Sequence, residues 1–431
     1  MSIEYFKKII RNISNSDNSR LIFKNYSALM LLQIANFVIP LLTLPYLLNV
    51  IGPKGYGTVV FALAFISYFV LVIEFGFDYS GTREIALANN KDDMNKIFSS
   101  VMALKAILFL ACLIIALILI ILVPFFHQDI TVYLIILIQL IFGLLNSNWV
   151  FQGLQVMKYI TIINVSSRIL MTIFIFLFIK SENDYYLYAI IYVLSSLLIG
   201  IASQMLIHIK LGIKFVKISL LDVKRQFDKG KHIFATTILA SVMSNTGIFV
   251  LGILGTKEAV GYFSVAERLI KAVQMVFSPI TKAIYPQVSQ RFGVSFSNGL
   301  KFVTKSLLII LVPLIFVFLG VGICAEFIYQ ILFSEEHLRH STLLSVLSFW
   351  GFLTIINNLL GIQTLIGSGH GKQYSISFTI AAICTLFSYF IFTPKFSAYG
   401  ISIGMILGEA ILTVLLITTI RKLKKVSVNR N

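Results

Sequence analysis

The sequence has 431 residues, of which 58% are hydrophobic and 12% are charged, and its mean hydropathy is +0.91. This composition excludes a soluble globular domain and indicates a chain that crosses a membrane many times. The formal net charge of +17 would point to nucleic acid in a soluble protein. In a membrane protein it follows from topology instead, so we expect membrane lipids as partners and no nucleic acid.

The chain begins with a basic, amphipathic stretch over residues 5–13. The first long apolar run lies behind it, which argues against a cleavable signal peptide. We therefore predict that residues 1–23 form a cytoplasmic segment that lies on the membrane surface.

Twelve apolar stretches follow, each long enough to cross a bilayer as a helix and joined by short connections. They predict an all-α polytopic membrane protein. The twelve stretches are Lys24–Val50, Gly57–Asp78, Phe98–Val123, Ile130–Phe151, Tyr159–Ile179, Tyr185–Ile207, His232–Leu254, Ala259–Ala283, Leu300–Ala325, Thr342–Gly367, Tyr374–Thr393 and Tyr399–Arg421.

Lysine and arginine set the predicted orientation. Most of them fall before the first stretch, after the last one and around the even-numbered loops, and Lys105 is counted with that side. The odd-numbered loops hold few. Because positive residues are retained on the inner side, both termini are predicted to be cytoplasmic. The basic residues of the odd-numbered loops are Lys54, Lys180, Lys257, Arg339 and Lys395.

An internal repeat divides the chain. The segment 48–62, with Gly52 and Gly57, runs parallel to 251–266, with Gly255 and Gly261. An even number of spans separates the copies, so they predict two six-helix lobes in parallel orientation with a substrate site between them. The expected divisions are a lobe at 24–209, a basic linker at 210–231, a second lobe at 232–421 and a basic tail at 422–431.

Three charged residues lie near the middle of the eighth stretch. At about 1.5 Å per residue, Arg268 lies roughly 14 Å from the start of that stretch, near the middle of a ~30 Å hydrocarbon core. Lys271 shares its face, because residues three apart are neighbours on a helix. We interpret this face as one that looks into water or at an anion. The alternative is an internal ion pair between Glu267 and Lys271, which would leave Arg268 unexplained.

Arg168 and Glu409 are also predicted at mid-membrane depth. Arginine suits phosphate because its planar fork binds two oxygens. We therefore predict that Arg168, Arg268 and Lys271 bind an anionic pyrophosphate headgroup. Glu267 and Glu409 are candidates for ion coupling, through H⁺ or Na⁺, or for ion pairing. The alternative for Arg168 is a pair with Glu409 or a backbone carbonyl.

Two interpretations are open for each of the other polar residues. Glu74, Asp78 and Arg83 fit an inner gate of ion pairs, and they equally fit the interfacial end of a helix. Mid-span amides fit sugar hydroxyls, although hydrogen bonds between helices are their commoner use. The candidates for sugar contact are Asn36, Asn245, Asn357, Asn358 and Gln363.

The remaining motifs give no cofactor or metal. Cys112, Cys324 and Cys384 are far apart in apolar stretches and predict neither disulfide nor metal. Residues 367–373 are a partial P-loop pattern that lacks its first glycine and the final Ser/Thr. His337 and His340 have no third ligand nearby.

Six segments carry a resemblance to a known family. They are LPYLLNVIGPKGYG (44–57), EFGFDYSGTREIA (74–86), NWVFQGLQVMKYITIINVSSRI (148–169), VGYFSVAERLIKAVQ (260–274), SPITKAIYPQVS (278–289) and GIQTLIGSGHGKQYS (361–375). Together, and in this order, they resemble the bacterial O-antigen flippases of the Wzx type, which share a superfamily with the multidrug and toxin extruders.

The resemblance implies two six-helix bundles around a V-shaped central cavity. It implies that the cargo is an undecaprenyl-pyrophosphate-linked oligosaccharide, carried to the periplasmic leaflet by alternating access coupled to an ion gradient. A polymerase and a chain-length regulator are the implied protein partners. The competing interpretations are a cation-exporting extruder of the same fold, a passive lipid scramblase, and a membrane glycosyltransferase or polymerase. A membrane glycosyltransferase or polymerase is disfavoured because such enzymes usually need a sizeable outer loop, and the outer loops of this chain are short.

Overall fold

The computed structural model describes residues 17–428, apart from the side chains at 17–24, 26, 232, 235–236, 239–245, 278–279, 282–283, 286 and 426–428. The described residues form helices joined by short turns, with no strand among them. Most of the predicted interfacial segment, residues 1–16, lies outside the described residues. The helices without strands, nine of them long and apolar enough to cross a membrane in the described residues, confirm the predicted all-α membrane class.

Two compact units make up the chain. Unit 1 comprises Met1–Thr43 and Ala62–Val242, and unit 2 comprises Leu44–Phe61 and Met243–Asn431. The two helices that pass from one unit to the other are α2 (Asp17–Glu74) and α10 (Leu220–Leu254). The boundary near residue 242 therefore falls inside α10. The residues predicted as a linker, 210–231, include a loop at 211–219 and the first turns of that helix.

A glycine divides α2 into the first two predicted spans. Gly52 has φ 70° and ψ 167°, a non-helical conformation that side chains with a Cβ rarely adopt. The helix therefore breaks there, between two apolar stretches, as the sequence predicts.

Unit 1 contains the helices from α3 to α9. Packed pairs include α3 with α7, α4 with α6, and α8 with α9. The fourth predicted span, Ile130–Phe151, is not one helix but three pieces. The elements are α3 (Phe77–Ala86), α4 (Lys91–Leu122), η1 (Pro124–Asp129), α5 (Ile130–Leu137), α6 (Gln139–Leu145), α7 (Asn148–Gly153), α8 (Lys158–Phe178), η2 (Glu182–Asp184) and α9 (Tyr185–Ile209).

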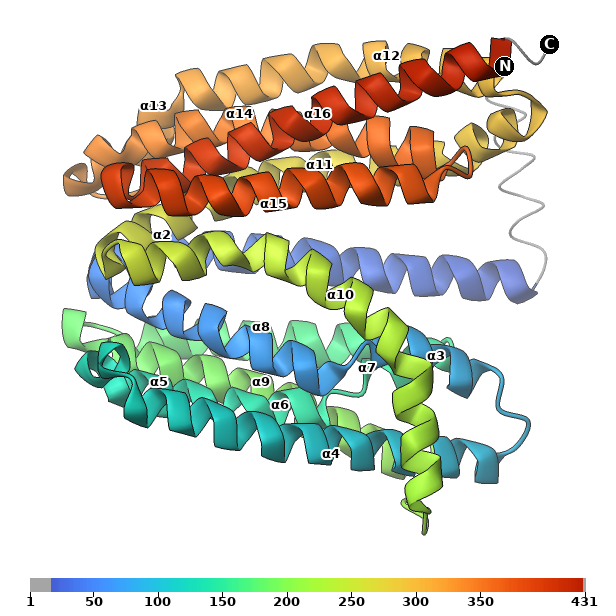
Figure 1. Ribbon diagram of the computed structural model, residues 1–431. Helices are drawn as coiled ribbons and strands as arrows, with labels where there is room; N and C mark the ends of the chain where they lie inside the picture. Colours follow the sequence, from blue (N-terminus) through green and yellow to red (C-terminus); the bar gives the residue numbers. More distant parts are fainter. Residues whose placement is uncertain (1–16, 429–431) are drawn as a thin grey trace. The chain divides into compact units, whose positions relative to one another are not determined.

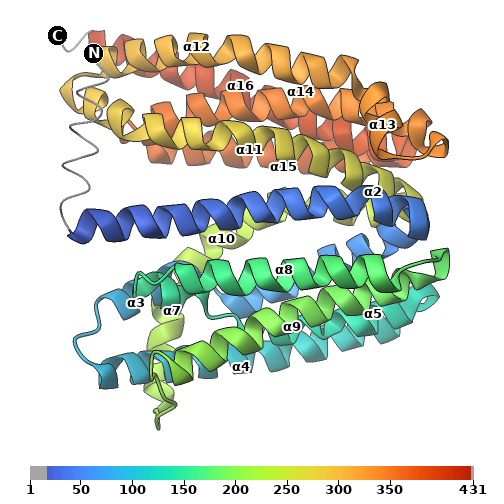
Figure 2. The same cartoon turned by 180° about the vertical axis from the view of Figure 1, so that it is seen from behind.

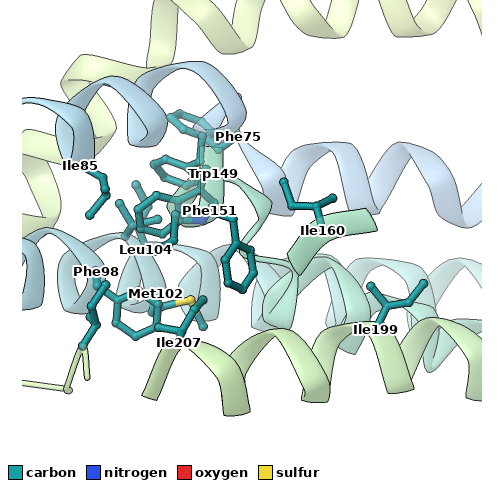
Figure 3. Packing of buried hydrophobic residues seen from close by; sticks show 14 of the residues in the cluster. Phe75, Ile85, Phe98, Met102, Leu104, Trp149, Phe151, Ile160, Ile199 and Ile207 are labelled. Carbon is teal, nitrogen blue, oxygen red and sulfur yellow. The ribbon is translucent and has the colours of Figure 1, made fainter. Parts of the chain in front are cut away.

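An aromatic core holds these pieces together (Figure 3). Trp149 is 1% exposed, and its ring lies 6.1 Å from that of Phe98 on α4. Phe75, just after α2, stacks on Phe234 of α10 with centroids 4.7 Å apart. Aromatic side chains bury large apolar areas, so this cluster fixes α2, α4, α7 and α10 to one another inside unit 1.

A capping box starts α10. The Ser219 hydroxyl accepts a hydrogen bond from the Asp222 amide, while the Asp222 carboxylate accepts one from the Ser219 amide. The carboxylate accepts hydrogen bonds from both the amide and the hydroxyl of Ser219, and these, together with Lys96 at 3.1 Å, lower the pKa of Asp222 to about 2. The first turn of α10, which follows the basic loop, is therefore held by hydrogen bonds with Ser219 and by an ion pair with Lys96.

Unit 2 is a bundle of long helices that lie side by side in both views (Figures 1 and 2). Its closest packed pair is α15 with α16, and α14 packs on α11, α12 and α16. The elements are α11 (Lys257–Val294), α12 (Phe296–Ile323), α13 (Ala325–Leu332), η3 (Glu335–His340), α14 (Ser341–Asn357), the π-helix η4 (Asn358–Ile366), α15 (Gly371–Phe396) and α16 (Ala398–Val428).

Nine stretches of the described residues are long and apolar enough to cross a membrane. One of them, Ser27–Ala86, covers the first two predicted spans. The seventh and eighth predicted spans correspond to α10 and α11, which are not among the nine. The chain is thus a multi-pass membrane protein, while the count of twelve spans stays a prediction.

The two repeat glycines pack reciprocally within unit 2. A Cβ on Gly57 would lie 1.8 Å from the backbone oxygen of Lys257, and one on Gly261 would lie 2.1 Å from that of Pro53. Real Cβ atoms are not found this close to a backbone oxygen, so only glycine lets the two repeat copies meet here. The internal repeat is therefore a packing motif, because each copy supplies the glycine against which the other rests.

Alanine at either glycine should loosen unit 2. We expect Gly57→Ala and Gly261→Ala each to lower stability by about 1–3 kcal/mol or more, since backbone atoms must move apart to fit the methyl group. Thermal unfolding of the purified protein in detergent measures this effect. Gly293→Ala is the matched control, because nothing lies within 4 Å of its Cβ position. Equal melting temperatures for all three variants would contradict the packing role.

Candidate functional site

Helix α11 carries an ion pair on its inner face. Glu267 is 4% exposed, and its Oε1 lies 2.8 Å from Nζ of Lys271, one turn further along. The i,i+4 spacing brings the two side chains to one face of the helix. The described structure thus contains the internal pair that the sequence left as an alternative.

Arg268, on the same helix, lies near an aromatic ring. Its guanidinium carbon lies 5.8 Å from the ring centroid of Tyr56, a fully buried residue of the segment Leu44–Phe61. A cation over an aromatic face is attracted by the electrons of the ring. Tyr56, in the repeat segment that also holds Gly57, is therefore a positioning residue for Arg268 that the sequence did not single out.

Glu409 on α16 is held by α14. Its carboxylate accepts hydrogen bonds from Nδ2 of Asn357 at 2.6 Å and from the Thr354 hydroxyl at 3.1 Å. Asn357 in turn accepts from the Thr413 hydroxyl at 2.8 Å. Asn357, expected as a sugar contact, thus has its amide bound to protein groups, and Thr354 is a partner that the sequence gave no reason to choose.

These groups share a cavity of about 220 Å³ inside unit 2. Its wall includes Glu267, Lys271, Thr354 and Glu409. The structure therefore brings together three of the predicted charged residues, from α11 and α16. Two carboxylates and one ammonium group thus line the same cavity.

A second cavity, of about 420 Å³, adjoins the first, and Thr354 lines both. Asn358 and Gln363, two of the predicted sugar contacts, lie in its wall. Asn357 is absent from that wall. The five amides expected to contact sugar are thus not equivalent.

Unit 1 contains a separate buried charge. Lys105 on α4 is 1% exposed and donates a hydrogen bond of 2.6 Å to the backbone oxygen of Asn146. Nδ2 of Asn146 donates to Oε1 of Glu74 at 2.8 Å. The charges of Glu74 and Asp78 both act on Lys105. The break between α6 and α7 is what frees the Asn146 carbonyl for this contact.

Lys105 was counted with the even-numbered loops, but it is a buried residue of α4. It sits among apolar residues, with Val101–Leu104 before it and Ala106–Leu110 after it. That flanking pattern is the signal that could have identified it. A lone lysine inside an apolar span needs an internal partner, because exposure to lipid is costly.

The other predicted residues lie apart. Asn36, Arg83 and Arg168 belong to unit 1, on α2, α3 and α8. Arg83 is exposed, while its neighbour Glu84 pairs with Lys229 of α10 at 2.5 Å. Asn36 and Arg168 are half-buried. The side chain of Asn245 lies outside the described residues.

The chain is similar to a protein-family model and to named proteins of two bacteria. The model of the family described as "Polysaccharide biosynthesis protein" matches residues 22–292. A protein of Escherichia coli (strain K12) named "Putative O-antigen transporter" is 28% identical over 404 residues, which cover 93% of this chain and 97% of that protein. A protein of the same name from Shigella dysenteriae is 24% identical over 402 residues, covering 92% and 100%.

Solved structures share the fold. One titled "Lipid II flippase MurJ, inward closed conformation" aligns with a TM-score of 0.72 at 14% identity, covering 91% of this chain and 87% of that one. An inward-facing multidrug resistance transporter of the MATE family aligns with a TM-score of 0.64 at 17% identity, covering 93% and 99%. The chain therefore shares its all-helical fold with these two solved structures.

The buried lysine generates a stability prediction. Lys105→Met removes the donor to Asn146 and the counter-charge of Glu74. Taking one partner out of a buried charged group costs about 3–5 kcal/mol, so we expect a large loss of stability. Thermal unfolding in detergent measures it.

The double variant Lys105→Met/Glu74→Gln should recover part of that loss, because the Glu74 carboxylate is then no longer left without its counter-charge. Lys91→Met, at an exposed position at the start of the same helix, is the control. A Lys105→Met protein as stable as the wild type would show that this cluster contributes nothing.

Proposed function

The chain belongs to the polysaccharide biosynthesis protein family, and we propose that it is a flippase for lipid-linked polysaccharide units. The cargo is undecaprenyl-pyrophosphate-linked oligosaccharide, moved from the cytoplasmic to the periplasmic leaflet of the bacterial inner membrane. Its relatives over nearly the whole chain are named as O-antigen transporters, and the fold is shared with a lipid II flippase. The relatives are named as transporters, so an enzymatic activity is not part of the proposal.

The observation that carries this proposal is the pair of adjoining cavities in unit 2. One is lined by charged groups and the other by amides and hydroxyls, and Thr354 belongs to both walls. A lipid-linked sugar has the same two parts, an anionic pyrophosphate and a polyhydroxylated, uncharged ring. We assign the pyrophosphate to Lys271, with Arg268 on the neighbouring face of α11.

We propose that the Glu267–Lys271 pair takes part in ion coupling. A pyrophosphate oxygen that approaches Lys271 competes with Glu267 for the ammonium group. Glu267 is 4% exposed, and a buried carboxylate that loses its counter-charge is costly. Glu267 is therefore the first candidate for the residue that couples cargo movement to H⁺ or Na⁺. Glu409 in the same cavity is the second candidate proton acceptor.

A cation-exporting extruder is the second candidate function. The likeness to a MATE transporter and the presence of two carboxylates against one lysine in the 220 Å³ cavity favour it. The two functions predict different phenotypes for a strain that lacks the protein. Loss of a flippase abolishes surface polysaccharide, whereas loss of an extruder leaves the polymer intact and raises sensitivity to cationic drugs.

The function of Lys271 is tested by complementation of the deletion strain. We expect Lys271→Met to lower surface polysaccharide by about tenfold or more, since ~1.4 kcal/mol of lost headgroup binding corresponds to tenfold. Lipid-linked repeat units should accumulate inside the cell. Surface polymer is read on gels, and lipid-linked units are read after extraction.

Two further variants separate function from stability. Lys271→Met/Glu267→Gln removes both charges, so it should be as stable as the wild type and still fail to export. Lys305→Met, at an exposed position on α12, should export normally. Normal surface polymer in the Lys271→Met strain would refute the assignment.

Arg268 gives an independent prediction. Arg268→Ala should abolish export while the protein still inserts, and Arg268→Lys should keep only part of the activity. A lysine is a point charge that cannot bind two phosphate oxygens at once, and it stacks less well on Tyr56. The same complementation assay measures both variants. Full activity of Arg268→Lys would indicate a simple electrostatic role.

A further inference from the structure

The larger cavity of unit 2 has the dimensions of a ligand site. Its volume of about 420 Å³ lies within the range of about 300–1,000 Å³ that is typical of small-molecule pockets. It lies among α11, α14 and η4, which pack on one another. The polar side chains of its wall are Gln274, Thr281, Tyr285, Thr354, Asn358 and Gln363.

The wall chemistry selects an uncharged, hydroxyl-rich ligand. None of the lining residues is Asp, Glu, Lys or Arg, whereas amides and hydroxyls can both donate and accept hydrogen bonds. Phe277, Ile355 and Ile362 supply the apolar surface that the CH face of a sugar ring can pack against. A phosphate would find no counter-charge here. An acyl chain would leave the amides unpaired, which is costly in a buried site.

Two amide oxygens in this wall lack a partner. Among the side chains that the structure describes, Oδ1 of Asn358 and Oε1 of Gln363 are buried without a hydrogen bond. Nearly all such groups in folded proteins are paired, so each exception calls for a ligand or water. Gln363 is fixed through its other amide atom, which donates to the Thr281 backbone oxygen at 2.9 Å. The terminal torsion of Asn358 is broad, so its amide can turn to meet a ligand.

The π-helix explains how both amides reach one cavity. Asn358 and Gln363 are five residues apart in η4. On an α-helix, with 3.6 residues per turn, positions five apart would point about 140° away from each other. A π-helix has i→i+5 hydrogen bonds, so residues at this spacing lie about one turn apart on the same side. π-helical turns are rare and occur often at functional sites.

We propose that this cavity binds an uncharged sugar residue of the lipid-linked cargo. The inference rests on the proposed flippase function and specifies its selectivity. Because Thr354 also lines the charged cavity that contains Lys271, the sugar in question is the one joined directly to the pyrophosphate. Asn358 and Gln274 are then specificity residues for that sugar, whereas Lys271 acts on the headgroup alone.

Direct binding to the purified full-length protein tests the proposal. The probes are undecaprenyl pyrophosphate and the same lipid carrying one sugar, with N-acetylglucosamine, galactose and glucose tested separately. We expect the wild type to bind at least one sugar-bearing lipid about tenfold more tightly than the bare lipid, which is ~1.4 kcal/mol.

Two cavity variants and one control complete the experiment. Asn358→Leu and Gln274→Leu should each abolish that preference, and their affinity for the bare lipid should stay at the wild-type level. Gln287→Leu makes the same change at an exposed position further along α11, and it should keep the preference. The two cavity variants lie on different elements, so a folding defect in one leaves the other to decide.

The outcomes separate the inference from the proposed function. If the wild type binds the bare lipid and every sugar-bearing lipid equally, or if both cavity variants keep the preference, the cavity holds water alone and the inference is overturned. The flippase proposal survives that result. If the wild type binds none of these lipids, the proposed function and the inference fall together.

Discussion

A charged or strongly polar side chain between membrane helices must find its partner inside the protein, and this constraint shapes both units. For a charged side chain at the centre of the bilayer, exposure to lipid costs at least about 2.5–3.5 kcal/mol. In unit 1 the constraint ties Lys105 of α4 to the Asn146 carbonyl and, through Asn146, to Glu74. In unit 2 it pairs Glu267 with Lys271 and holds Glu409 against Asn357 and Thr354.

The same constraint separates structural from functional polar groups. Asn357 has its amide fully engaged by Glu409 and Thr413, so it fastens α14 to α16. Its neighbour Asn358 begins the π-helix and has a buried oxygen with no partner within the described part of the chain. One residue step therefore divides a structural amide from one that is available to a ligand. Lys271, with a side chain that is 40% exposed, is accessible in a way that Lys105 is not.

Composition and periodicity predicted the membrane class, most helix positions and the break at Gly52, because these depend on local sequence. They also predicted Glu267, Lys271 and Glu409 as charged candidates at mid-membrane depth. They could not show that Glu409 meets Asn357, 52 residues away, because that contact depends on which helices pack together. The π-helix was missed for the same reason, since an i→i+5 spacing arises from packing and has no sequence period of its own. Lys105 was missed because a residue near the end of a span was read as a loop residue.

Leaflet exchange in vesicles tests the central claim most directly. Purified protein is reconstituted in liposomes that contain undecaprenyl-pyrophosphate-linked oligosaccharide with a fluorescent label on the sugar, and an impermeant quencher reads how much label is exposed outside. The account predicts that the protein makes the protected, inner-leaflet label accessible, and that vesicles with Lys271→Met/Glu267→Gln behave like protein-free vesicles. Label that stays protected with the wild-type protein, both with and without a proton gradient, would contradict the account.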